Sequence, residues 1–145
     1  MDLEWLTEAL GEVDVLAAVV AILATMVLGA IWYAPQVFGE VWRKEAGLSK
    51  KAMEDKEGMA TMYAGMIVLN LFTVWFLGAT LIGTGVVEVL DATILGAVFG
   101  LVFAAFPHAV HAFFERKSVT YMALTGGHNI LNFAVMALVL AVFGL

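Results

Sequence analysis

Residues 15–34 read VLAAVVAILATMVLGAIWYA, a run of 20 residues without a charged side chain. A helix of this length crosses the hydrocarbon core of a bilayer, which is about 30 Å thick. Three further apolar runs lie at about 59–83, 92–114 and 119–145. Each run is apolar on all sides, as is typical of a helix surrounded by lipid or by other helices. The sequence therefore predicts an all-α integral membrane protein, a four-helix bundle.

The composition supports a single membrane domain over residues 1–145. Of the 145 residues, 63% are hydrophobic and 14% are charged, and the mean hydropathy is +0.97. The absence of cysteine excludes disulfides and thiolate ligands. Seven Lys and Arg residues, divided between two short loops, do not make the clustered basic face that nucleic acid requires. We therefore expect the lipid bilayer as a partner and no nucleic acid.

The positions of the cations predict the orientation in the membrane. All seven fall between the first and second runs or between the third and fourth: Arg43, Lys44, Lys50, Lys51, Lys56, Arg116 and Lys117. Because basic loops stay in the cytoplasm, we expect a multi-pass protein of the cell membrane with both termini external. In the first loop Val37, Phe38, Val41 and Trp42 recur at helical spacing, which predicts a short interfacial helix.

The ionisable side chains within the runs are histidines, and such groups inside a membrane indicate a functional site. Measured by helical rise from the cytoplasmic boundary, His108 lies about 10 Å deep and His128 about 13 Å deep. The third and fourth helices must be antiparallel neighbours, so these two imidazoles are expected to face one another. Asn residues share their level. The predicted pore or ligand-binding residues are Asn70, His108, His128, Asn129 and Asn132.

Small residues and a proline shape the third helix. Gly96 and Gly100 recur at i+4 on the face that carries His108, a spacing that permits close helix packing within the chain or between copies. Pro107 cannot donate to the carbonyl of Phe103 and is expected to kink the helix beside His108.

A metal ion is a further hypothesis for the same face. The spacing His108-x-x-His111-x-x-x-Glu115 puts two imidazoles and a carboxylate on one side of the helix, and His128 would complete a four-ligand set for zinc or a similar divalent ion. In the alternative interpretation, His111 and Glu115 only reach for the headgroup region. Enzyme activity is not expected, because Ser49 and Ser118, the only serines, lie in loops and no paired acids occupy the membrane.

Six residues at the end of the first apolar run carry a recognisable pattern: Trp32, Tyr33, Pro35, Phe38, Gly39 and Trp42. It resembles the aromatic-Tyr-x-Pro-x-x-Phe-Gly-x-x-Trp signature of a prokaryotic membrane family catalogued as domain of unknown function 1761. Residues 114–117 and the Gly-Gly-His-Asn segment at 126–129 also look like that family's closing hairpin. The resemblance covers nearly the whole chain and implies a small multi-span protein with no established activity.

Two functions remain open at this stage. In the first, the protein forms a permeation or binding site for a small solute, a proton or a metal ion, lined by His and Asn. Four spans enclose little space, so this interpretation favours a homo-oligomer. In the second, the protein is a non-catalytic accessory or structural subunit that docks a protein partner, and its polar seam only fixes helix packing.

Overall fold

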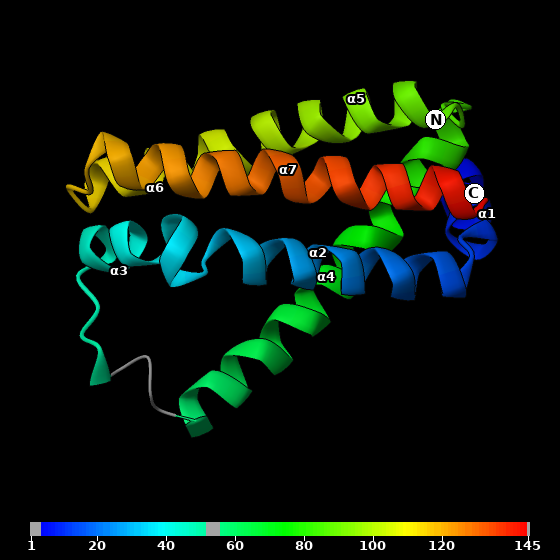
Figure 1. Ribbon diagram of the computed structural model, residues 1–145. Coiled ribbons are helices and arrows are strands. Elements are labelled where there is room, and N and C mark those ends of the chain that lie inside the picture. Colours follow the sequence, from blue (N-terminus) through cyan, green and yellow to red (C-terminus); the bar gives the residue numbers. More distant parts are fainter. Residues whose placement is uncertain (1–3, 52–55, 145) are drawn as a thin grey trace.

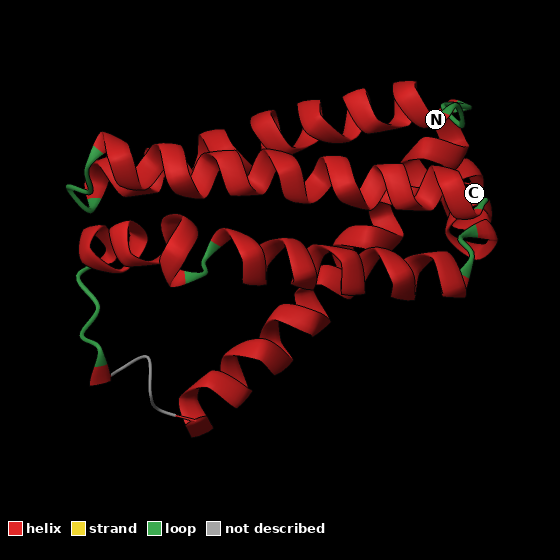
Figure 2. Ribbon diagram, viewed as in Figure 1, coloured by secondary structure: helices red, strands yellow, loops and turns green. Residues whose placement is uncertain are grey.

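The computed structural model describes residues 4–51 and 56–144, which form helices joined by short turns and contain no strand (Figure 2). The elements in chain order are α1 (Glu4–Glu12), α2 (Val15–Trp32), η1 (Pro35–Gly39), α3 (Glu40–Ala46), α4 (Lys56–Thr84), α5 (Val89–Phe99), η3 (Gly100–Ala105), α6 (Phe106–Phe114) and α7 (Val119–Phe143). Segments η1 and η3 are π-helical.

Four helices in the described part of the chain are long and apolar enough to cross a membrane: Val15–Trp32, Glu57–Thr84, Val89–Phe114 and Val119–Phe143. The third of these consists of α5, η3 and α6 in one continuous path. The expected all-α bundle of four spans is therefore confirmed. The short helix predicted in the first loop is also present, as η1 followed by α3.

Helix α7 is the centre of the bundle, with α2 against one side and the α5–η3–α6 span against another (Figure 1). Helix α4 crosses the bundle obliquely and packs against α1, α2 and α7. Its first half diverges from the other spans (Figure 1), and side chains 60–69 on it are exposed. Because apolar exposure is normal for a surface that faces lipid, this face suits a membrane.

The two ends of the bundle differ in charge. Helix α1 and the last turn of α7 lie together at one end, whereas α3 and the α6–α7 turn lie at the other (Figure 1). The second end carries Arg43, Lys44, Arg116 and Lys117 and is called the basic end below. This separation is what the distribution of cations predicts.

The core near the opposite end is apolar and tightly packed. Its largest fully buried side chains are Leu81, Met136, Leu140 and Val74, and α2 contributes the buried alanines 17, 18 and 21. Since alanine brings backbones close together, α2 can approach α4 and α7 there.

The glycine stripe of the third span lies against α7 of the same chain. A Cβ atom added to Gly96 would be 2.6 Å from the Cβ of Ala137, and one added to Gly100 would be 2.8 Å from the carbonyl oxygen of Asn129. Both distances are shorter than carbon and oxygen atoms tolerate. The glycine spacing permits close packing within the chain or between copies. In the structure, both glycines pack within the chain.

Pro107 is accommodated by a π-helical stretch directly before it. The N–H of Phe106 donates to the carbonyl of Leu101, five residues back, as the π-helix ends. Pro107 then occupies the first turn of α6, directly after the π-helical residues. The expected disturbance of the helix beside His108 thus takes the form of an inserted residue, a common cause of helix irregularity near functional sites.

Candidate functional site

A turn at the end of α2 places Tyr33 at the basic end of the bundle. The N–H of Tyr33 still donates to Gly29 of the helix at 2.9 Å, but Ala34 is extended and Pro35 starts the π-helical turn. The chain then runs through η1 and α3 to Gly47, which ends α3 at a φ of 76°. We call residues 34–47 the strap.

Gly39 is required by the shape of this turn. A Cβ atom at position 39 would lie 2.1 Å from the carbonyl oxygen of Tyr33 and 2.9 Å from that of Ala34. Both neighbours are backbone atoms, which cannot move aside as a flexible side chain would. The glycine of the Phe-Gly pair therefore lets the strap fold back tightly and keeps Tyr33 in place.

The ring of Tyr33 contacts two other rings. Its centroid is 5.0 Å from that of His128 on α7 and 5.0 Å from that of Trp42 on the strap. Tyr121 also lies within electrostatic range of Tyr33. On the far side, the ring of Tyr121 is 5.7 Å from that of His108 on α6. We call His108, Tyr121, Tyr33 and His128 the His–Tyr cluster.

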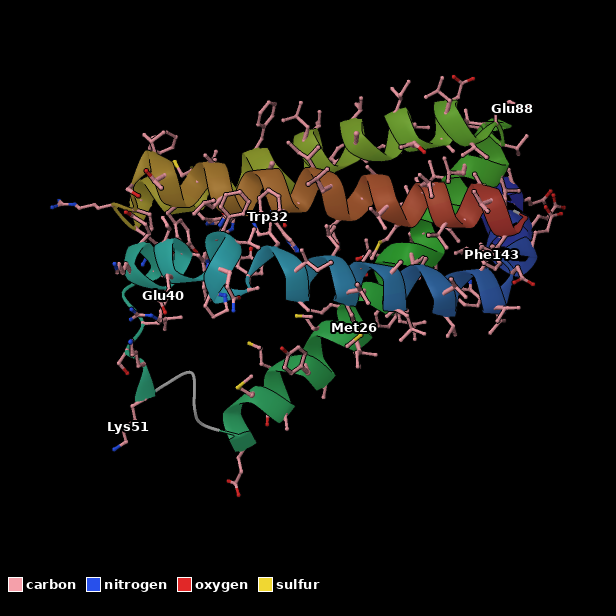
Figure 3. All side chains as sticks on the ribbon, in the orientation of Figure 1. Met26, Trp32, Glu40, Lys51, Glu88 and Phe143 are labelled. Carbon is pink, nitrogen blue, oxygen red and sulfur yellow. The ribbon has the colours of Figure 1, made fainter. Side chains whose placement is uncertain are left out.

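Trp32, the last residue of α2, contacts α7 beside this cluster (Figure 3). Its indole N–H donates to the carbonyl of Leu124 at 3.2 Å, and its ring lies 6.2 Å from that of His128. Gly127 faces the indole, and a Cβ there would lie in ordinary van der Waals contact with the ring, at 3.5 Å. Phe38 of the strap covers the indole at a centroid distance of 4.6 Å.

Two nitrogen atoms of the cluster are buried and have no hydrogen-bond partner in the described part of the chain: Nε2 of His108 and Nε2 of His128. A buried polar atom without a partner costs about 1–3 kcal/mol. Proteins keep few such atoms. The His–Tyr cluster holds two such atoms.

The α6–α7 turn holds the far end of the strap. Nζ of Lys117 donates to the carbonyl of Ala46 at 3.1 Å and lies 5.4 Å from the centroid of the Tyr121 ring. The hydroxyl of Ser118 donates to the carboxylate of Glu45 and accepts from the N–H of Tyr121 at 3.0 Å, which caps α7. Both residues thus touch the strap and Tyr121 together.

The strap also has an internal ion pair. Arg43 donates to the carboxylate of Glu40 at 3.0 Å and to the carbonyl of Leu48 at 2.9 Å. The hydrogen bond with Arg43, and next its positive charge, lower the pKa of the Glu40 carboxyl below its ordinary value of 4.5. This pair fixes the turn after α3 and touches none of the cluster rings.

The sequence predicts that His108 and His128 face each other, but in the structure the ring of each histidine contacts the ring of a tyrosine. Along α7, Tyr121 and His128 are separated by two helical turns, or about 10 Å. The depths predicted from helical rise assume that Glu115 and Val119 lie at the same level. In the structure, Ala105 lies opposite Gly126 and His108 lies beside Tyr121. The third helix is therefore about one turn out of the assumed register. The two histidines belong to one cluster only through the tyrosines between them.

The remaining predicted residues lie outside the ring contacts that define the cluster. His111 and Glu115 are exposed. Within residues 4–51 and 56–144, no three His, Asp or Glu side chains are grouped so as to hold a metal ion, so the four proposed metal ligands are not brought together. Asn129 packs at Gly100 through its backbone. Asn70 and Asn132 are half-buried on α4 and α7.

Tyr33 and Tyr121 are the members that the sequence argument left out of the site. In the sequence, Tyr33 stands out only as part of the aromatic motif at the end of the first apolar run. Tyr121 lies in the last apolar run and outside the predicted binding set. The spacing of Tyr121 and His128, seven residues apart and hence on one helical face, is the signal that could have joined them.

The comparisons with known proteins agree with the motif at the end of α2. The model of the family described as "Protein of unknown function (DUF1761)" matches residues 16–141. This range includes the strap and all four members of the His–Tyr cluster. No curated protein and no solved structure matches the chain.

Proposed function

The chain belongs to the DUF1761 family of proteins of unknown function, and for this member we propose a binding site for a proton or a small hydrogen-bonding solute in the membrane. The site is the His–Tyr cluster at the basic end, which is expected to face the cytoplasm. The observation that carries the proposal is the pair of buried Nε2 atoms without partners.

The four side chains suit this role by their chemistry. An imidazole exchanges a proton in the physiological range, and a phenol can both donate and accept a hydrogen bond. Tyr33 contacts His128, and Tyr121 contacts His108, so each imidazole has a phenol beside it. A small solute bound at Nε2 would satisfy the buried atom, and a proton bound there would make it an N–H donor for which a phenol oxygen can be the acceptor.

Binding is favoured over permeation by the opposite half of the bundle. Beyond the cluster, the core consists of alanines of α2 and the fully buried Leu81, Met136 and Leu140. Thr25, also buried, donates its hydroxyl to the carbonyl of Ile22 in its own helix at 2.8 Å. A polar pathway through this half would need unpaired polar groups or water, which the close packing of small apolar residues disfavours. We therefore propose a site open from one side.

The second candidate is the accessory or structural subunit. It is favoured by the interlocking of the strap, in which Phe38 and Trp42 pack on Trp32 and Tyr33. On this interpretation the polar seam orders the helices and binds nothing.

Histidine NMR of the protein in lipid nanodiscs distinguishes the two functions. With 15N-labelled histidine, the Nε2 signals of His108 and His128 are followed from about pH 5 to about pH 8, the range in which imidazoles titrate. We expect both signals to change as a proton binds at Nε2. We also expect Tyr33→Phe, which removes one hydroxyl and keeps the ring, to alter the change at His128 and to leave the signal of His111 as in the wild type. Exposed His111 serves as the internal reference.

Proton flux in liposomes completes the test. We expect the wild-type protein to leak protons no faster than empty liposomes under an imposed potential. Flux that disappears in His128→Gln but persists in His111→Gln would replace binding by permeation. Imidazoles that keep one protonation state throughout, together with unchanged spectra for Tyr33→Phe, would contradict the proposal and leave the structural subunit.

A further inference from the structure

The strap is a short segment that is attached to the bundle through two turns. It begins at the π-helical turn closed by Gly39, whose N–H donates to Ala34 at 2.9 Å, and it ends at Gly47 in the left-handed region. Glycine in the left-handed region, as at Gly47, allows a backbone change that a side chain would hinder. Between these points α3 is a helix of seven residues, too short to be stable without its contacts.

The strap covers one ring of the cluster and one ring beside it. Trp42 packs edge-on against Tyr33 at 5.0 Å, and Phe38 covers Trp32 at 4.6 Å. Both covered residues in turn contact His128. Moving the strap would therefore uncover the side of the cluster that holds His128.

The contacts that hold the strap are shared with the cluster. Lys117 joins the carbonyl of Ala46 to the ring of Tyr121. Ser118 joins the carboxylate of Glu45 to the N–H of Tyr121. A change at the strap therefore reaches Tyr121, which contacts His108.

We infer that the strap is a lid over the His–Tyr cluster and that Lys117, with the Ser118–Glu45 pair, is its latch. The inference rests on the proposed function, because it names how the same site is opened and closed. With the latch made, the cluster is shielded from the solution at the basic end. With the latch broken, the lid moves away from Trp32 and Tyr33 and admits the proton or solute. By linkage, occupancy of the cluster and opening of the lid influence each other reciprocally.

Chemical modification of histidine measures the opening directly. The intact protein in nanodiscs is treated with diethyl pyrocarbonate at constant pH, and the modification rate at each histidine is read by mass spectrometry. Lys117→Met, which keeps a long side chain without the ammonium, should raise the rate at His128 about five-fold, the factor expected for the loss of one ordinary hydrogen bond. Lys44→Met is the matched control, since Lys44 is an exposed lysine of the strap itself. His111 should keep its rate throughout.

A tether tests the opposite direction. The chain contains no cysteine, so Glu45→Cys combined with Ser118→Cys can be bridged by a short, reducible bifunctional thiol reagent. Bridging should lower the rate at His128 below that of each single-cysteine variant, and reduction should restore it. This double variant does not depend on how Lys117→Met folds.

The outcomes separate the lid from the proposed function. Equal rates at His128 in the bridged, reduced, Lys117→Met and wild-type proteins would overturn the lid, whatever the NMR titration shows. Rates that follow the latch support the lid. If they do so while the imidazoles fail to titrate, the lid stands over a structural seam and the proposed function alone is lost.

Discussion

Replacing Gly39 by alanine tests how the site is built, because the substitution adds one methyl group at the fold of the strap. The backbone at Gly39 has φ −60° and ψ −40°, which any residue adopts, so no torsional strain is introduced. In an ordinary helix the change would stabilise by about 1 kcal/mol through helix propensity. Here the new Cβ would lie 2.1 Å from the carbonyl oxygen of Tyr33.

The magnitude follows from that distance. A carbon and an oxygen without a bond between them settle near ~3.5 Å, so the backbone at Tyr33 or the strap must move by more than 1 Å. Overpacking costs about 1–3 kcal/mol where side chains can adjust. Because both close neighbours are backbone atoms, we expect Gly39→Ala to fall at the upper end, about 3 kcal/mol. The movement should also separate Tyr33 from His128.

Reversible unfolding in mixed micelles, followed by helical circular dichroism, gives the free energy of unfolding. Gly65→Ala is the control, since a Cβ at this helical position meets nothing within 4 Å and should leave the protein as stable or slightly more stable. A Gly39→Ala protein that is at least as stable as the wild type would refute the steric reasoning and the reported shape of the turn.

Three further predictions concern contacts around the site. Gly100→Leu should destabilise the protein by about 3 kcal/mol by overpacking, because its Cβ would lie 2.8 Å from the carbonyl oxygen of Asn129; Val98→Leu, at an exposed position, should be tolerated in the same unfolding assay. Trp32→Phe should cost about 1 kcal/mol through the lost hydrogen bond to Leu124, whereas Trp42→Phe keeps a ring against Tyr33 and should cost less. Because Arg43 lowers the pKa of Glu40 below 4.5, the stabilisation from this pair should be complete above about pH 4.5 and be lost as the pH falls through the lowered folded-state pKa. Glu40→Gln should abolish that part of the pH dependence, and an unchanged pH profile would contradict the role of the pair.

The spans could be predicted from the sequence because each is an apolar run long enough to cross the hydrocarbon core. Because all seven cations fall in two loops, the sequence also predicted that these two loops lie at the same end of the bundle. The motif around Pro35 and Gly39 marked the end of α2, since proline cannot continue a helix. The backbone contact that requires Gly39 could not be foreseen, because it depends on a π-helical turn that no residue pattern specifies.

The membership of the site was harder to predict, since it depends on register between helices. Helical rise gives the depth of a residue only relative to a reference level. The predicted depths take the two ends of the α6–α7 turn as that level. The structure sets Ala105 opposite Gly126, which shifts the third span by about one turn. That shift replaces His128 by Tyr121 as the neighbour of His108. Periodicity groups residues on one face of a helix, but it does not align that helix with its neighbour.

The position of Asn70 has a different physical cause, the length of its helix. The span Glu57–Thr84 has 28 residues and is about 42 Å long by helical rise, well beyond the ~30 Å hydrocarbon core. A helix longer than the membrane accommodates the mismatch by tilting, and α4 crosses the bundle obliquely (Figure 1). Its second half is held by α1, whose Leu10 carbonyl accepts from the indole of Trp75 at 2.8 Å. The tilt then moves the first half of α4 away from α2. This half carries Asn70, which equal depth alone had placed beside the histidines.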